Sequence, residues 1–233
     1  MYSYASIIKL VFLYLAAREG RLVPGFLHNI NNSLHLLKMN FSLLDRDLSS
    51  PKSEKRLQAC KNVIKQFDKL NKIAGDRQFY VNESVQQIYI NDFISWLVAY
   101  WKNDSFCKHR VELDVGGDGL YNTITIAPYV LTFCLEEGLI NSLEELKDKD
   151  GLFNITFKVT IIDNKVVFEL SSPTELKTDK PFMPFLTTKD GHLGFGLYLT
   201  QELIKHWDGE VKLYSKESQT IFQISLPLIS KQE

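Results

Sequence analysis

The chain has 233 residues, a formal net charge of −1 and an ordinary apolar content of 45%. This length accommodates one large domain or two small ones, and the near-neutral charge provides no basic surface for binding nucleic acid. The three cysteines, Cys60, Cys107 and Cys134, are odd in number and far apart, so they show neither a disulfide framework nor metal-ligand spacing and favour a reducing compartment.

The first apolar run covers residues 6–17. It contains Lys9 and is shorter than the roughly 20 apolar residues that a membrane-spanning helix needs. It also makes a poor signal peptide, because Arg18 follows Ala16 and Ala17 where a cleavage site would lie. We interpret the run as a packed or dimer-forming helix, and we expect a cytoplasmic protein without membrane insertion and without a transmembrane sensor of its own.

Helical periodicity extends over residues 3–48, with one predicted break at Pro24-Gly25. A turn follows at 49–53, and a second helical pattern covers about 54–74 and ends near Gly75. The apolar residues that recur on one face are Phe26, Ile30, Leu34, Leu37, Phe41, Leu44 and Leu48 in the first helix, and Leu57, Cys60, Ile64, Phe67 and Leu70 or Asn71 in the second. Two such helices predict an antiparallel hairpin that forms a four-helix bundle in a homodimer.

From about residue 80, short strand-like runs alternate with helices. We expect strands at 86–90, 109–115, 152–162, 165–171, 209–215 and 219–226, and helices at 91–106, 127–147 and 195–207. Asp163-Asn164 is typical of a hairpin turn, and the proline-containing residues 172–193 are typical of a long loop. The pattern predicts a two-layer α/β sandwich. The whole chain is then α+β, with a helical domain at 1–78 and the sandwich at 79–233.

His28 is the first candidate functional residue. At 100° per residue it lies about 160° from the centre of the apolar stripe, so it projects into solvent. Asn32, one turn later, lies on the same side. An exposed histidine that titrates near neutrality is an available nitrogen nucleophile. An ordinary surface histidine is the plainer interpretation, and His35 lies on nearly the same face, so geometry alone does not choose between the two.

The sequence around His28 resembles the phosphoacceptor helix of two-component sensor histidine kinases. The matches to the family pattern aGxxHEInNPL are Gly25, His28, Ile30, Asn31, Asn32 and Leu34. The resemblance implies that His28 receives a phosphoryl group. The chain departs from the pattern at Ser33, usually Pro, and at Asn29, where the family has an acid that accepts the imidazole proton. Because Asn cannot act as a base, this departure argues against autophosphorylation more than against accepting or relaying phosphate.

Residues from about 80 to 228 resemble the ATP-binding domain shared by histidine kinases, gyrases and Hsp90-type chaperones. The first stretch that carries this resemblance is the N box, LEEGLINSL at 135–143. Its Glu137 and Asn141 are four apart and share a helix face. The resemblance implies that Asn141 holds Mg²⁺ against the nucleotide phosphates and that Glu137 assists the chemistry, since Mg²⁺ prefers oxygen ligands. Taken without the neighbouring motifs, the stretch favours a surface helix that carries a polar pair.

The second stretch, PFMPFLTTK at 181–189, resembles the FxPFxTTK segment of the flexible lid. It implies that Thr188 and Lys189 approach the terminal phosphate when the lid closes. The third stretch, at 191–199, resembles the GxGLGL box. Glycines let backbone N–H groups approach phosphates at a helix N-terminus. The glycines that match this box are Gly194 and Gly196, while His192 replaces the first one.

One box of this family is missing. Between the N box and the lid, the family has a strand that ends in DxGxG, whose Asp bonds the adenine amino group. Here the strand at 166–170 continues into Ser171-Ser172-Pro173-Thr174, without Asp or Gly. A site that loses its key hydrogen-bonding partner can lose orders of magnitude in discrimination. We therefore expect weak or absent adenine recognition, which argues against the ATP and Mg²⁺ that the other boxes imply.

Two functions agree with these features. The first is a histidine phosphotransferase or pseudokinase-type relay, in which His28 exchanges phosphate with the receiver domain of a response regulator. The second is an active, ATP-dependent sensor histidine kinase that autophosphorylates His28. Asn29 and the missing adenine box favour the relay, whereas Asn141, the lid motif and the two glycines favour the kinase. The sequence favours the relay slightly, and a structural dimer without phosphate chemistry ranks below both.

Overall fold

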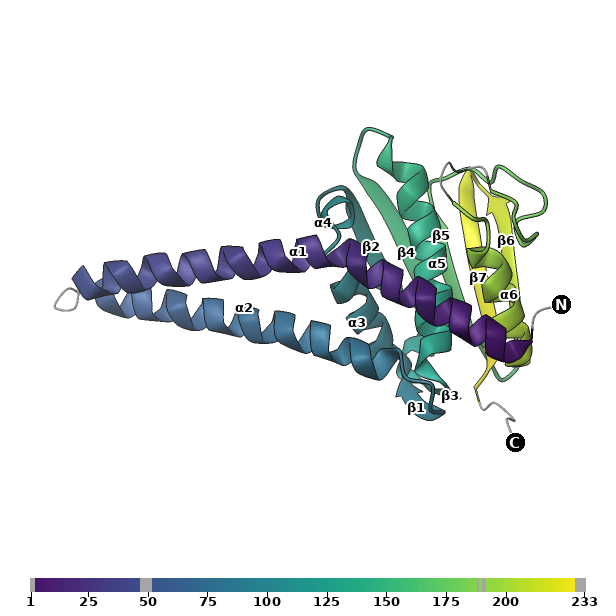
Figure 1. Ribbon diagram of the computed structural model, residues 1–233, viewed down its shortest axis with the longest axis horizontal. Helices are drawn as coiled ribbons and strands as arrows, with labels where there is room; N and C mark the ends of the chain where they lie inside the picture. The colour runs from purple at the N-terminus through teal and green to yellow at the C-terminus, as the bar shows by residue number, and fades with distance from the viewer. Residues whose placement is uncertain (1–2, 47–51, 188, 190–191, 229–233) are drawn as a thin grey trace.

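The computed structural model describes residues 3–46, 52–187, 189 and 192–228. A long antiparallel helical hairpin is followed by an α/β domain, and the tip of the hairpin extends far from that domain (Figure 1). The predicted α+β class and the order of its two parts are confirmed.

The hairpin consists of α1, Tyr4–Arg46, and α2, Lys52–Tyr80. The predicted break at Pro24-Gly25 is wrong, because α1 continues through both residues. An interior proline destabilises a helix by about 3 kcal/mol. Here packing against the α/β domain stabilises the helix at this point. Gly25 lies against the backbone of Asn103, so closely that a Cβ at this position would be 1.6 Å from the carbonyl oxygen. Tertiary packing thus overrides the local signal.

The second helix also differs from its prediction at both ends. It begins at Lys52, so only residues 49–51 of the predicted turn are left, and these lie outside the described residues, as does Leu48. It continues through Gly75 to Tyr80, where its last turn packs into the α/β domain.

The first half of α1 packs on the α/β domain. Ile7, Val11 and Leu15 are buried in a core shared with that domain, and α1 crosses α5 and α6 (Figure 1). Near its start, the ring of Tyr4 stacks on His206 at a centroid separation of 3.4 Å. The predicted packed helix is confirmed. No helix within the described ranges is long and apolar enough to cross a membrane.

The α/β domain contains two sheets. The larger has the strand order β2-β4-β5-β7-β6, in which β2 is parallel to β4 and all other pairs are antiparallel, and the smaller pairs β1 with β3. The elements are β1 Gln86–Tyr89, α3 Ile90–Trp101, α4 Ser105–Arg110, β2 Val111–Gly116, a 3-10 turn at Asp118–Tyr121, β3 Thr123–Ile126, α5 Pro128–Lys147, β4 Phe153–Ile162, β5 Lys165–Ser172, α6 Gly196–His206, β6 Glu210–Lys216 and β7 Gln219–Pro227.

Two elements depart from the sequence prediction. The helix expected at 91–106 is interrupted after Trp101, because Asp104 caps a new helix by accepting a hydrogen bond from the backbone N–H of Cys107 at 2.9 Å. Strand β3 was not predicted, although its alternating buried residues Ile124 and Ile126 carry the strand pattern. The hairpin turn at Asp163-Asn164 is confirmed, since both residues have the positive φ of a type I′ turn.

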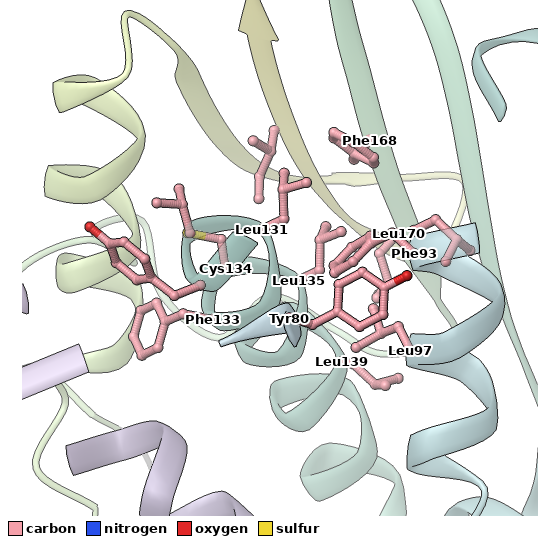
Figure 2. Close-up of a cluster of buried hydrophobic side chains, with 14 of the residues drawn as sticks. Tyr80, Phe93, Leu97, Leu131, Phe133, Cys134, Leu135, Leu139, Phe168 and Leu170 are labelled. Carbon is pink, nitrogen blue, oxygen red and sulfur yellow. The ribbon is translucent and has the colours of Figure 1, made fainter. Parts of the chain in front are cut away.

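Helix α5 forms the centre of the core. It is buried along nearly its whole length between the sheet and the other helices. Figure 2 shows Leu131, Leu135 and Leu139 of α5 beside aromatic and aliphatic side chains from α2, α3 and β5, which include Tyr80, Phe93, Leu97, Phe168 and Leu170. Because the N box lies on this helix, its side chains are held by the most tightly packed part of the domain.

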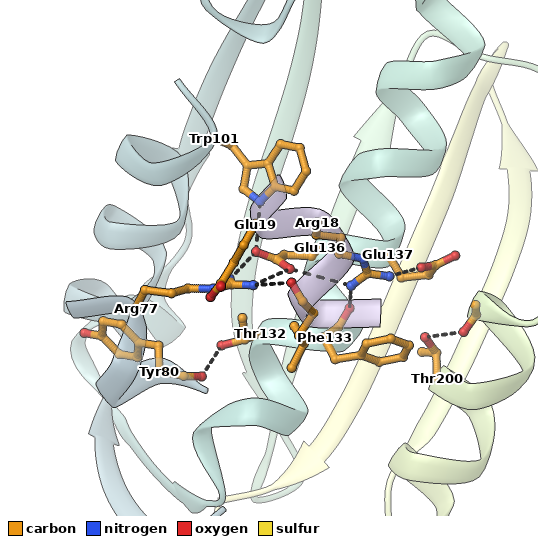
Figure 3. Close-up of polar contacts among 12 residues, drawn as sticks. Arg18, Glu19, Arg77, Tyr80, Trp101, Thr132, Phe133, Glu136, Glu137 and Thr200 are labelled. Atoms are coloured by element: carbon orange, nitrogen blue, oxygen red, sulfur yellow. Dashed lines mark hydrogen bonds and ion pairs between the residues drawn. The ribbon is translucent and has the colours of Figure 1, made fainter. Parts of the chain in front are cut away.

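A buried ion pair joins α2 to α5. Arg77 donates to the carboxylate of Glu136 at 2.5 Å, and the indole N–H of Trp101 donates to the same carboxylate at 3.2 Å (Figure 3). Burial alone would lower the pKa of Arg77, but the attraction of Glu136 outweighs it and the net pKa is raised. Arg77 is only 4% exposed and Glu136 is fully buried, so each charge depends on the other.

We predict that Arg77→Ala lowers the free energy of unfolding by about 3–5 kcal/mol, because it leaves the buried Glu136 charge without its main partner. The measurement is urea unfolding followed by circular dichroism. Lys72→Ala, which removes the exposed pair with Asp76 on the same helix, serves as the control and should change stability by less than about 0.5 kcal/mol. Equal stabilities for the two variants would contradict the assignment.

Candidate functional site

A cavity of about 170 Å³ lies between α5, the lid segment and the start of α6. We call it the N-box cavity. It brings together residues that are far apart in the sequence and that sequence analysis selected, namely Glu137, Asn141, Lys189, Gly194 and Gly196. Thr188, the other lid residue selected, lies outside the described residues.

The polar groups of the N-box cavity form one connected set. The side-chain amide of Asn141 donates to Glu137 Oε1 at 3.2 Å. Lys189 Nζ, from the lid, donates to Asn141 Oδ1 at 2.9 Å and to Glu144 at 2.8 Å. The lid lysine therefore rests on the N-box helix, and the oxygen of Asn141 that would coordinate Mg²⁺ is bound to an ammonium group in this arrangement.

Two glycines allow the close packing around these groups. A Cβ on Gly196 would be 1.8 Å from Glu137 Oε1, so only glycine lets the first residue of α6 approach that carboxylate. Gly194 has a φ of 65°, and a Cβ there would be 2.7 Å from the carbonyl oxygen of Leu186. Gly194, Phe195 and Gly196 place the start of α6 on the cavity lining, and the N-terminus of a helix favours an anion. The residues at the α6 end of the N-box cavity therefore suit a phosphate group.

Sequence analysis missed a partner of the N box that comes from the first helix. Arg18 donates through Nη2 to Glu137 Oε2 and through Nη1 to the carbonyl of Phe133 at 3.0 Å (Figure 3). Arg18 is 6% exposed. The partners are more than a hundred positions apart, so no spacing rule connects them. The one sequence feature that could have indicated this contact is the position of Arg18 directly after the apolar run at 6–17.

A tyrosine from the same helix also lines the N-box cavity. Burial, followed by the negative charge of Glu137, raises the pKa of Tyr14, so its phenol stays protonated at neutral pH. Three residues beyond Arg18, the guanidinium of Arg21 lies 3.5 Å from Glu144, the carboxylate that also binds Lys189. The first half of α1 thus borders the cavity and neutralises the acids around it.

Hydroxyl groups occupy the end of the cavity where the family places its adenine-binding Asp. Ser142 donates to Ser172 at 3.0 Å, and the Ser172 and Thr174 hydroxyls are 2.9 Å apart. Two carboxylates line the cavity near these hydroxyl groups: Glu145, which is paired with Lys177 at 2.6 Å, and Glu175. Residues 171–174, which stand in place of the family's DxGxG, thus supply hydroxyl groups and no carboxylate, and Glu175 directly follows them on the cavity lining.

His28 lies outside the N-box cavity, exposed on α1 as predicted. The amide of Asn32 donates to its Nε2 at 2.9 Å, in the tautomer that carries the proton on Nδ1. Arg21, which binds Glu144 beside the N-box cavity, lies seven residues earlier on this side of α1. It is therefore about 10 Å from His28 along the helix axis. His35 is exposed as well. The structure therefore pairs His28 with Asn32 but does not bring either into contact with the N box.

Asn29, which stands where the family has an acid, is bound to the α/β domain. Its amide donates to Asn103 Oδ1 at 2.8 Å, and its own Oδ1 accepts from Lys108 Nζ at 2.7 Å. A carboxylate could not donate the first of these bonds. Asn29 thus serves as a link between the hairpin and the domain, and it provides no base beside His28.

We predict opposite effects for two Gly→Ala substitutions. Gly196→Ala should lower the free energy of unfolding by about 1–3 kcal/mol, because the new Cβ displaces a carboxylate that Arg18 and Asn141 hold in place. Gly75→Ala, on a helix position with open space around it, should raise it by roughly 0.5–1 kcal/mol. Thermal or urea unfolding of the two variants checks both signs, and a Gly196→Ala protein as stable as the parent would refute the close approach.

Comparisons with known proteins bear on sequence and fold. No family model matches the chain. The sensor histidine kinase ZraS of Salmonella typhimurium is 24% identical over 222 residues, 92% of this chain and 47% of that protein. Sporulation kinase E of Bacillus subtilis is 27% identical over 219 residues, 90% of this chain and 28% of that protein. The chain therefore spans less than half the length of these curated relatives.

Solved structures of histidine kinases share the fold. The catalytic domain of ThkA matches with a TM-score of 0.56 and 16% identity, covering 63% of this chain and 97% of that one. Full-length ShkA in complex with AMPPNP matches with a TM-score of 0.56 and 15% identity, covering 100% of this chain and 47% of that one. ThkA in complex with the response regulator TrrA matches with a TM-score of 0.52 and 16% identity, covering 95% of this chain and 64% of that one. The chain has the fold of a histidine kinase core: a helical hairpin followed by an ATPase-type catalytic domain.

Proposed function

We propose that this chain acts in two-component signal transduction as a histidine phosphotransfer relay. Residues 1–78 provide the dimerisation and phosphotransfer hairpin, and residues 79–233 provide an ATPase-type domain that does not supply the phosphate. The similarity to sensor histidine kinases along most of the chain supports the signalling role. The solved complex of ThkA with TrrA supports a response-regulator receiver domain as the partner.

In the proposed reaction, the lone pair of His28 Nε2 attacks the phosphorus of a phosphoaspartate on the receiver. The bond between phosphorus and the carboxylate oxygen breaks, the carboxylate leaves, and the Nδ1 proton is released to water. Before the attack the Asn32 amide donates to this same Nε2 lone pair, which keeps that nitrogen unprotonated, and the hydrogen bond breaks as Nε2 bonds to phosphorus. After transfer the same amide can donate to a phosphoryl oxygen, so Asn32 acts as a positioning residue in both states.

The observation that carries the relay over a kinase is the ion pair between Arg18 and Glu137. The N-box acid is bound to a buried guanidinium and is therefore not free to assist phosphoryl transfer from a nucleotide. The hydroxyl groups at the adenine end and the amide at Asn29 point the same way, since neither supplies a carboxylate. Any phosphate on His28 then comes from another protein.

One observation favours the second candidate, an active kinase that uses ATP and Mg²⁺. The phosphate end of the N-box cavity keeps Asn141, Lys189 and the glycine-lined start of α6. In that case Asn141 would hold Mg²⁺ and Lys189 would meet the terminal phosphate, which requires Lys189 to leave Asn141. Bound nucleotide would supply the phosphoryl group, and His28 would accept it.

The transfer test separates the candidate histidines. We expect a phosphorylated receiver domain to label the wild-type chain and the His35→Gln variant equally, and to leave His28→Gln unlabelled. The readout is acid-labile radiolabel on the chain after gel electrophoresis. Label on His28→Gln at the wild-type level would show that the phosphoacceptor has been misassigned.

A homodimer through the hairpin is also proposed. Leu27, Leu34 and Phe41 of α1 form an apolar stripe that is about half exposed, and Leu57 and Ile64 extend it on α2. Their spacing in α1 is seven residues, as in the seam of a helical bundle. An exposed apolar seam of this length is stabilised by burial against a second copy.

We predict that Leu34→Glu with Phe41→Glu converts a dimer into a monomer of about 26.9 kDa, because four carboxylates would meet at the seam of each bundle. Light scattering after size exclusion provides the mass. His35→Glu adds a charge outside the stripe and should leave the dimer intact. A wild-type chain that is already monomeric at micromolar concentration would contradict the proposed bundle.

A further inference from the structure

A second cavity lies where the hairpin meets the ATPase-type domain, and we call it the junction cavity. Its volume is about 450 Å³, within the range of roughly 300–1,000 Å³ typical of small-molecule pockets. Its walls come from α1, α2, α3, α4 and the residues between α3 and α4, and it shares no lining residue with the N-box cavity. Of its lining residues, the function proposed above uses only the amides of Asn29 and Asn32.

The charge around the junction cavity is all of one sign. Lys69, Lys102 and Lys108 line it, and none of its lining residues is acidic. Lys102 Nζ donates to the carbonyl of Val111 at 2.7 Å, and Lys108 donates to Asn29. Each ammonium group has three donors, so both keep two for a ligand. Lys69 has no acceptor among the described residues. None of the three lysines forms an ion pair there with a described carboxylate.

The other lining groups are apolar or neutral. Leu70 and Ile73 of α2 and Ala99 of α3 supply an apolar wall, and Asn32 of α1 supplies an amide. A ligand that fits this lining has an anionic group for the lysines and an apolar or aromatic body for the wall. Three ammonium groups that come from two parts of the chain suit the three oxygens and double charge of a phosphate better than a carboxylate.

We propose that the junction cavity binds a small organic phosphate monoester. This inference goes beyond the proposed relay and does not depend on it. Such a ligand would contact both the hairpin and the ATPase-type domain, so its binding would stabilise the arrangement in which the two are packed together. It would also be linked to His28, because the Asn32 amide that lines the cavity is the donor to His28 Nε2.

The test uses the full chain without Mg²⁺ and three probes: phenyl phosphate, benzoate and inorganic phosphate. Benzoate keeps the aromatic body with a single charge, and inorganic phosphate keeps the charge without the body. By calorimetry we expect phenyl phosphate to bind at least about tenfold more tightly than either of the others. Benzoate binding as tightly as phenyl phosphate would overturn phosphate recognition, as would the absence of phenyl phosphate binding at millimolar concentration.

Variants locate the site. Lys69→Ala with Lys108→Ala should weaken phenyl phosphate binding at least about tenfold, because two charged donors are lost. Both side chains are exposed, so the double variant should fold, and circular dichroism verifies this. Lys61→Ala, two turns earlier on the exposed surface of α2 and outside the cavity, should bind like the parent. Unchanged affinity in the double variant would overturn the proposal.

Hydrogen exchange distinguishes the two cavities. With phenyl phosphate bound, we expect slower amide exchange in residues 29–36 and 99–108, which border the junction cavity. Protection confined to residues 137–145 and 192–197 would place the ligand in the N-box cavity and overturn the assignment. Neither outcome depends on whether His28 accepts phosphate, so this experiment and the transfer assay fail or succeed separately.

Discussion

The arrangement of this molecule depends on two adjacent carboxylates in the middle of α5. Glu136 binds Arg77 from one helix of the hairpin, and Glu137 binds Arg18 from the other (Figure 3). The guanidinium groups also lie over aromatic rings, Arg77 over Tyr100 at 4.7 Å and Arg18 over Phe133 at 4.5 Å. Buried pairs of this kind add little net stability but penalise every arrangement that separates them. They therefore determine how the hairpin sits on the domain.

The ion pair between Arg18 and Glu137 also determines what the N-box acid can do. By binding Glu137, Arg18 orients the N-box acid toward Gly196 and at the same time neutralises it. Further along α1, Asn29 likewise links the hairpin to the domain through hydrogen bonds and supplies no base to His28. In both places a residue that would assist phosphoryl transfer from a nucleotide instead holds the two parts of the chain together. A histidine that receives phosphate from another protein needs neither group.

Local patterns predicted most of the fold, and long-range contacts account for the differences. The hairpin turn at Asp163-Asn164 and the exposed position of His28 follow from short-range geometry. The uninterrupted path of α1 through Pro24 does not, because it depends on how Gly25 packs against Asn103. In the site, the motifs located Glu137, Asn141 and Lys189. No pattern could locate Arg18, because its partner lies on an element that only the folded chain brings near.

The acid of the N-box cavity is bound by Arg18, and its adenine end carries hydroxyl groups. We therefore expect this cavity to bind ATP too weakly to serve His28. Titration of Mg·ATP into the full chain by calorimetry tests this most directly. We expect a dissociation constant above about 1 mM, equivalent to a binding free energy of roughly −4 kcal/mol or weaker. Binding at submillimolar concentration would contradict it and would make the chain a nucleotide-dependent kinase core.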